Sequence, residues 1–92
     1  MIGYKWDPAK NALNKRLHGI SFEEASKIFE HETLGWPDER FDYGEERWIA
    51  IGVAGEKEIV VTYVEQEDHR RIISARETTR RERALYWRTI GR

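Results

Sequence analysis

The sequence predicts a single small α+β domain in which helices pack against an antiparallel sheet. Two amphipathic segments near the amino terminus begin with helix-capping residues, and a third helical segment ends the chain. Between them lie three strand-like segments separated by short polar turns, a pattern typical of an antiparallel meander. The 92 residues leave room for one domain, residues 1–92, whose sheet needs helices for stability. The predicted order is β-α-α-β-β-β-α.

The amino-terminal third predicts a short strand and two helices. Residues 4–6 are an extended candidate, and Asp7 is placed to cap a helix that ends at Gly19. Its apolar stripe would consist of Ala9, Leu13 and Leu17. Ser21 and Glu24 form a capping box for the second helix. The buried face of that helix would consist of Phe22, Ala25, Ile28 and Phe29.

The middle of the chain changes from helical to extended character. Glycine, proline and aspartate interrupt residues 33–46, which we interpret as a loop. The strand candidates that follow are residues 47–53, 58–64 and 70–75. In the first of them, Ile49, Ile51 and Val53 share one face. We expect the β-branched second segment to be the central strand.

The last element is predicted to be a helix with a capping box at its start. Thr79 would be the N-cap and Glu82, three residues later, would complete the box. The side chains expected to face inward are Leu85, Tyr86 and Ile90.

Composition limits the classes of protein to which the chain can belong. It contains no cysteine, which excludes a disulfide framework, a thiolate metal site and a cysteine nucleophile. The amino terminus lacks a secretory signal pattern, and no apolar run is long enough to cross a membrane. We therefore expect a cytoplasmic protein that does not interact with membranes.

Charge is strongly segregated along the chain. Residues 1–69 carry eight lysines and arginines against fifteen acidic residues, for a balance of −7. Residues 70–92 carry eight arginines, no lysine and two glutamates, for a balance of +6. A solvated helix face usually mixes lysine with glutamate, whereas arginine alone favours bidentate contacts to phosphate or carboxylate. The carboxy-terminal segment is therefore predicted to bind a polyanion or an acidic partner.

The titratable residues suggest a few candidates for chemistry. No two histidines have metal-ligand spacing with a carboxylate, so we infer no metal and no cofactor. His18 lies at a helix end, where it is either a cap or a general acid or base. Glu45 next to an arginine-rich sheet is either a surface ion-pair partner or a base for an RNA 2′-hydroxyl. Arg47, Arg71 and Arg76 would then stabilise the phosphorane charge.

Three groups of residues carry a resemblance to a known family. The first consists of Trp6-Asp7-Pro8-x-Lys10, Asn14 and His18-Gly19-Ile20-Ser21-Phe22-x-Glu24-Ala25. The second consists of Asp42-x-Gly44-Glu45-x-Arg47 and Ile51-Gly52. The third consists of Arg71-Ile72-Ile73-Ser74-Ala75-Arg76, Arg80, Glu82-Arg83 and Tyr86. Together, in this order and over nearly the whole chain, they resemble the BrnT family of toxins.

This resemblance implies a RelE-like fold and a metal-independent ribonuclease activity that inhibits translation. It also implies a partner, a BrnA-like antitoxin with a ribbon-helix-helix domain, through which alone the toxin would reach operator DNA. The catalytic candidates by matching position are His18, Glu45, Arg47, Arg71 and Arg76. The candidates for RNA binding are Lys10, Arg80 and Arg83. A homodimer is compatible with the sequence, although nothing in it requires one.

Two departures from the family pattern leave an alternative function open. Leu17 stands where the family often has lysine, and Gln66 where arginine is common. Loss of two cations near a phosphate site would weaken catalysis. The alternative is therefore a catalytically weak homologue that acts mainly as an antitoxin-binding subunit in an operon-repressing complex. An autonomous nucleic-acid-binding protein ranks last, because residues 1–69 would repel a polyanion.

Overall fold

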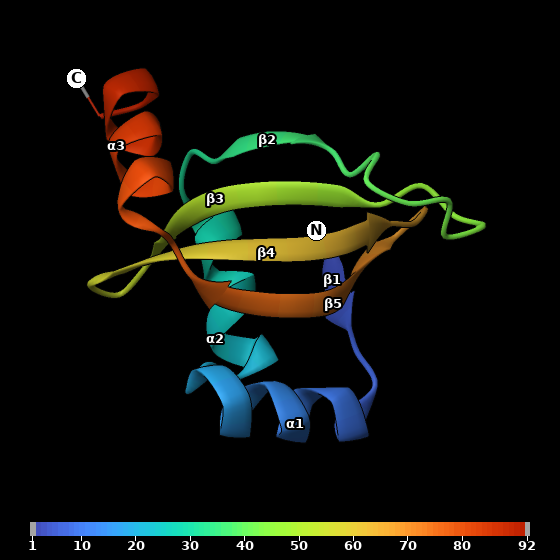
Figure 1. The fold of residues 1–92 in the computed structure, drawn as a ribbon. Coiled ribbons are helices and arrows are strands. Elements are labelled where there is room, and N and C mark those ends of the chain that lie inside the picture. Colours follow the sequence, from blue (N-terminus) through green and yellow to red (C-terminus); the bar gives the residue numbers. More distant parts are fainter. Residues whose placement is uncertain (1, 92) are drawn as a thin grey trace.

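A computed structural model describes residues 2–91, which form one sheet with helices on both of its faces (Figure 1). The strands are β1 (Gly3–Lys5), β2 (Leu34–Pro37), β3 (Trp48–Ala54), β4 (Lys57–Glu65) and β5 (His69–Glu77). The helices are α1 (Pro8–His18), α2 (Phe22–Ser26), the 3₁₀ helix η1 (Lys27–Glu30) and α3 (Arg80–Thr89). The strand order across the sheet is β1-β5-β4-β3-β2. None of these helices is long and apolar enough to span a membrane.

The predicted meander is confirmed, but the sheet is mixed rather than antiparallel. β3, β4 and β5 pair as antiparallel neighbours in sequence order. β1 pairs in parallel with the start of β5, with Gly3 opposite His69. The prediction was wrong here because short turns determine the direction of consecutive strands only. The direction in which β1 joins the sheet depends instead on the helices that separate it from β5.

The structure also corrects the element order, because part of the predicted loop is a fourth meander strand. Residues 34–37 form β2 and pair with β3 at the sheet edge. Gly35 suits this position, since a Cβ atom there would lie only 3.1 Å from the Ile49 carbonyl oxygen. Pro37 ends the strand at an edge, where a missing N–H group is tolerated. Glycine and proline thus mark an edge strand here rather than a loop.

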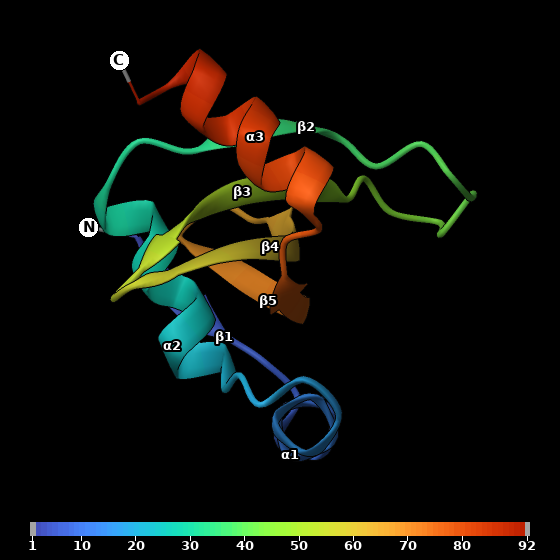
Figure 2. The same cartoon turned by 60° about the vertical axis from the view of Figure 1, so that its left-hand side comes forward.

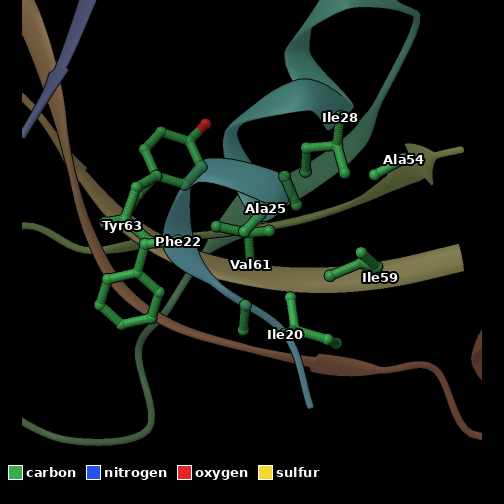
Figure 3. Close-up of a cluster of buried hydrophobic side chains, with 11 residues drawn as sticks. Ile20, Phe22, Ala25, Ile28, Ala54, Ile59, Val61 and Tyr63 are labelled. Atoms are coloured by element: carbon green, nitrogen blue, oxygen red, sulfur yellow. The ribbon is translucent and has the colours of Figure 1, made fainter. Parts of the chain in front are cut away.

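The main core lies between the sheet and the α2–η1 segment (Figure 3). Ser21 caps α2 by accepting a hydrogen bond from the Glu24 amide at 3.0 Å. Phe22, Ala25 and Ile28 are fully buried against β3, β4 and β5, as predicted. The close fit explains a glycine in β3. A Cβ atom on Gly52 would lie 2.7 Å from the Ile28 Cβ atom.

The apolar stripe predicted for α1 is wrong. Asp7 caps this helix, but Leu13 and Leu17 are 44% and 64% exposed. The inward residue is Asn14, which is buried against the edge of β5. The helix therefore docks on the strand edge through a polar side chain, a possibility that apolar periodicity does not reveal.

The opposite face of the sheet is covered by α3 at one end only (Figure 2). Thr79 and Glu82 form the predicted capping box at the start of α3. Tyr86 is buried against Ile51 and Val60 and donates a hydrogen bond to the Glu32 carbonyl oxygen at 2.9 Å. Leu85, predicted to face inward, is exposed. The remainder of this face, which is turned toward the viewer in Figure 1, forms the candidate site.

Candidate functional site

The open part of the sheet holds a pocket whose floor contains both polar and apolar side chains. Its floor comes from adjacent positions of three strands, namely Ile49, Val60, Thr62 and Ser74. Strand alternation places these residues on the face opposite the α2 core. Thr62 pairs with Ser74 across β4 and β5, so two hydroxyl groups lie side by side on the open face. Such polar residues in the middle of a sheet are typical of a site rather than of a core.

Arg76 provides one cation of this pocket and is held by a carboxylate. Its two terminal nitrogens donate to the two carboxylate oxygens of Glu82 at 2.8 and 2.9 Å. Glu82 also accepts a hydrogen bond from the Thr79 amide at 2.8 Å, which ties the pair to the start of α3. The Arg76 guanidinium lowers the pKa of Glu82 to about 2. The ion pair therefore fixes the direction of the guanidinium at the pocket.

Arg40 provides a second cation, which sequence analysis missed. Its guanidinium donates to both carboxylate oxygens of Asp38, at 2.8 and 2.9 Å, and lines the same pocket. The Asp38 side chain is fully buried and also accepts a hydrogen bond from the Tyr43 hydroxyl at 3.2 Å. The Arg40 guanidinium lowers the pKa of Asp38 to about 2. The only sequence signal was the Asp-x-Arg spacing after β2, which does not indicate the direction of the loop.

His18 reaches the pocket from the last turn of α1. Asn14, one turn earlier, anchors this helix to the free edge of β5. Its side-chain amide donates to the Ala75 carbonyl oxygen at 2.9 Å and accepts from the Ala75 amide at 3.1 Å. It also donates to the Ile20 carbonyl oxygen at 2.9 Å. The Asn14 side chain thus makes the hydrogen bonds to β5 that a neighbouring strand would make. It thereby holds α1 where His18 lines the same pocket as Arg76.

Glu45, Arg47 and Arg71 form a second cluster at the end of the sheet where β3 and β5 begin. Glu45 accepts a hydrogen bond from Arg71 Nη2 at 2.5 Å and another from Arg47 Nε at 3.2 Å. The Arg47 guanidinium also lies over the Tyr43 ring, 4.0 Å from its centroid. Arg71 is paired opposite Val64, two residues beyond Thr62. The alternation of β4 therefore places this cluster on the same face as the pocket.

A second, more apolar pocket adjoins the first beside α1. Lys10 and His18 line it together with Leu13, Leu17 and Ile73. His18 and Ser74 line both pockets, which makes the two hollows neighbours. Lys10 and His18 therefore line one pocket, and contact of Lys10 with RNA stays a prediction.

The predicted residues of α3 lie elsewhere. Arg83 pairs with Glu58 Oε1 at 3.5 Å. Arg80 is exposed in the first turn of the helix. Neither residue lines either of the two pockets described above. Contact with RNA at these positions remains a prediction.

The arrangement as a whole suits an anionic ligand that undergoes proton transfer. Arginines with fixed directions bind phosphate oxygens and stabilise charge that develops on them. A histidine at the same pocket is a candidate general acid or base. Among residues 2–91, no group of three or more His, Asp or Glu side chains lies close enough to hold a metal ion.

Comparison with known proteins places this chain in a family. The model of a family described as the ribonuclease toxin, BrnT, of type II toxin–antitoxin systems matches residues 6–82. Among solved structures, the Brucella abortus ribonuclease toxin BrnT is similar, with a TM-score of 0.70 and 23% sequence identity. That similarity covers 87% of this chain and 100% of the other, and at this identity it shows the fold alone. No curated protein matches the sequence significantly.

The family match extends over most of the chain and includes most of the elements that form the site. It begins before α1, which carries Lys10, Asn14 and His18, and ends at Glu82, the partner of Arg76. Since the match spans well over half of the 92 residues, the chain belongs to the BrnT family of ribonuclease toxins of type II toxin–antitoxin systems.

Proposed function

We propose that this chain is an endoribonuclease that cleaves RNA without a metal and thereby inhibits translation. The observation that carries the proposal is the pocket on the open sheet face, where His18 lies beside Arg40 and Arg76. A proton carrier and fixed cations around one hollow are the groups that RNA transesterification needs. The second cluster, around Glu45, adds a carboxylate and further arginines on the same face.

In the proposed reaction a base removes the proton of a ribose 2′-hydroxyl, and the oxygen attacks the adjacent phosphorus. The bond from phosphorus to the 5′-oxygen breaks, and an acid protonates that leaving oxygen. The products are a 2′,3′-cyclic phosphate and a 5′-hydroxyl. We assign the proton-carrying roles to His18 and Glu45. Arg47, Arg71 and Arg76 stabilise the charge of the phosphorane.

The flanking RNA is held by cations outside the pocket. Lys10 lies beside His18 at the apolar pocket, and it contacts a phosphate on that side. Arg80 and Arg83 lie on α3, beyond Arg76, and contact phosphates on the other side. These contacts raise affinity without selecting a sequence, because phosphates are the same at every position.

Membership of a type II family supports an antitoxin as the partner. We propose a BrnA-like antitoxin with a ribbon-helix-helix domain, which neutralises the toxin and brings it to operator DNA. The toxin contacts operator DNA only through this partner. Co-expression of the antitoxin is expected to restore growth, and a chain that stays toxic with the antitoxin bound would contradict neutralisation.

The experiment that tests the reaction uses the purified chain, a labelled single-stranded RNA and EDTA. Cleavage is expected to persist in EDTA and to stop when the RNA is replaced by its 2′-deoxy counterpart, because the nucleophile is then missing. His18→Ala is expected to lower the cleavage rate at least about a hundredfold, which is typical of a lost acid or base.

The matched control is His31→Ala, which removes an exposed histidine that lines neither of the two pockets of the candidate site. Its cleavage rate is expected to equal that of the parent chain. Cleavage of the 2′-deoxy substrate, or complete inhibition by EDTA, would exclude the proposed reaction.

The second candidate is a catalytically weak homologue that serves mainly as the antitoxin-binding subunit of an operon-repressing complex. The observation that favours it is the exposed Leu17 at the pocket beside His18, where the family often has a cation. Under this alternative, Leu17→Lys combined with Gln66→Arg raises the cleavage rate from a low level. An unchanged rate would argue against it.

A further inference from the structure

The loop of residues 38–47, which joins β2 to β3, presents an aromatic ring to solvent next to the arginines of the site. Phe41 is 69% exposed, more than any other large apolar side chain among residues 2–91. A ring left in water adds little to the stability of the fold, because hydrophobic stabilisation requires burial. Single exposed apolar side chains are common on protein surfaces, so the case for a ligand at Phe41 rests on the groups around its ring.

The loop around Phe41 has a fixed shape. The buried carboxylate of Asp38 accepts hydrogen bonds from the Arg40 guanidinium and from the Tyr43 hydroxyl. The Asp38 amide donates to the Arg47 carbonyl oxygen at 2.7 Å and thereby extends the pairing of β2 and β3 into the loop. Such fixed geometry reduces the entropy that a ligand must remove on binding.

Contacts connect Phe41 to the arginines on both sides. Its ring packs edge-to-face on Tyr43, with the centroids 5.8 Å apart. The Tyr43 ring lies under the Arg47 guanidinium, which in turn donates a hydrogen bond to Glu45. On the other side, Arg40 is the adjacent residue and lines the pocket with His18 and Arg76. An exposed ring thus lies between cations from two clusters of the site.

We propose that Phe41 is a base-stacking platform for single-stranded RNA, and this inference rests on the proposed ribonuclease function. A nucleobase next to the cleaved phosphate stacks on the Phe41 ring while Arg40 and Arg47 bind adjacent phosphates. Single-stranded RNA is commonly held by this combination of aromatic rings and cations, and stacking accepts every base. The platform therefore positions the RNA without selecting its sequence.

The alternative ligand is an acidic segment of the antitoxin, which the same arginines would attract. The two ligands differ in what they require at position 41. Stacking needs an aromatic ring, whereas apolar contact with a protein segment is provided by leucine as well. The pair of variants Phe41→Leu and Phe41→Trp therefore distinguishes them.

The test measures fluorescence anisotropy of a labelled single-stranded oligoribonucleotide with chains that carry His18→Ala, so that cleavage is too slow to affect the measurement. Phe41→Leu is expected to weaken the affinity about tenfold, whereas Phe41→Trp stays within about twofold of the parent. The control Trp87→Leu removes another exposed aromatic ring, on α3, and is expected to leave the affinity unchanged. Far-ultraviolet circular dichroism confirms that each variant is folded.

Three outcomes would overturn the stacking role. If Phe41→Leu binds RNA with the same affinity as the parent, the stacking role of Phe41 is wrong and the proposed function is unaffected. If Phe41→Leu binds both RNA and the antitoxin normally, whereas Phe41→Ala loses affinity for the antitoxin, the loop belongs to the protein interface. If the parent binds no single-stranded RNA at all, both the platform and the proposed function are wrong.

Discussion

Each arginine at the site is paired with a carboxylate before any ligand binds. Asp38 holds Arg40, Glu45 holds Arg71 and Arg47, and Glu82 holds Arg76. A guanidinium has five donor hydrogens, so an arginine paired in this way still has donors for a phosphate. The carboxylates orient these cations and also reduce the net charge that an RNA meets.

The pair of Arg76 and Glu82 is expected to make stability depend on pH. The folded-state pKa of Glu82, about 2, lies below its ordinary value of 4.5. Its contribution is therefore complete above about pH 4.5 and is lost as the pH falls toward 2. Glu82→Gln should lower the free energy of unfolding at pH 7 by about 1 kcal/mol and flatten its decline in acid. Urea titrations from pH 7 to pH 2 measure both effects.

The control for this prediction is Glu67→Gln, which changes an exposed carboxylate in the turn before β5. It should leave the unfolding free energy and its pH profile unchanged. A Glu82→Gln variant with the same acid profile as the parent would contradict the role of the ion pair.

At the scale of single residues, most but not all of the site could be predicted from the sequence. The sequence predicts five residues of the site, and the structure gathers them on one sheet face in two clusters. These residues are His18, Glu45, Arg47, Arg71 and Arg76. Arg40 was missed because its place at the pocket depends on how the buried Asp38 carboxylate holds the loop of residues 38–47. The chemical type of a residue can be read from the sequence. Its distance from the other residues of the site depends on how the loop of residues 38–47 is held in the fold.

At the scale of elements, α1 is attached to the sheet mainly by an amide. β1 pairs only with the first residues of β5, so the edge of β5 near Ala75 has no neighbouring strand. Asn14 takes that place with one donor and one acceptor. Unpaired backbone groups at a buried edge are costly, which explains a buried asparagine on a helix that exposes two leucines.

Asn14→Ala is expected to destabilise the protein and to disturb the site. Loss of three hydrogen bonds to buried backbone groups should lower the unfolding free energy by about 2–4 kcal/mol. The Ala75 amide should then exchange its hydrogen faster with solvent. Denaturant titration and amide hydrogen exchange measure these effects.

The matched control is Lys15→Ala, which alters an exposed neighbour on the same helix and keeps a strong helix former. It should change the unfolding free energy by less than about 0.5 kcal/mol. If Asn14→Ala were equally mild and Ala75 stayed protected from exchange, the amide would not be the anchor.

The order of elements could be predicted where local signals act alone. Asp7, Ser21 and Thr79 cap their helices as predicted, because a capping hydrogen bond involves only neighbouring residues. β2 and the parallel pairing of β1 could not be predicted, since both depend on contacts between segments far apart in sequence.

At the scale of the whole molecule, the candidate site depends on where the charged side chains lie and on which face of the sheet the helices leave open. The net charge is −1, yet Arg40, Arg47, Arg71 and Arg76 lie on the part of the sheet that α3 leaves open. α2 and η1 occupy the other face with the main core, so the open face can carry polar residues without loss of that core. Under the proposed function, RNA is therefore expected to be attracted to this face rather than to the molecule as a whole.

Binding of single-stranded RNA should weaken steeply with salt. Seven phosphate contacts, four from the arginines of the two clusters and three from Lys10, Arg80 and Arg83, predict a slope of log affinity against log salt of about −5. Affinity should then fall about a thousandfold between 50 and 200 mM salt. Arg76→Ala should reduce the slope by about 0.7, whereas Arg88→Ala, on the exposed side of α3, should not. A slope near zero would contradict phosphate binding at this face.

The measurement that tests the account most directly is inducible expression of the chain alone in bacteria. Growth and the integrity of total RNA would be followed for the parent and for a folded Arg76→Ala variant. The account predicts growth arrest with RNA decay from the parent, and normal growth with intact RNA from the variant. Normal growth and intact RNA from a well-expressed, folded parent chain would contradict it.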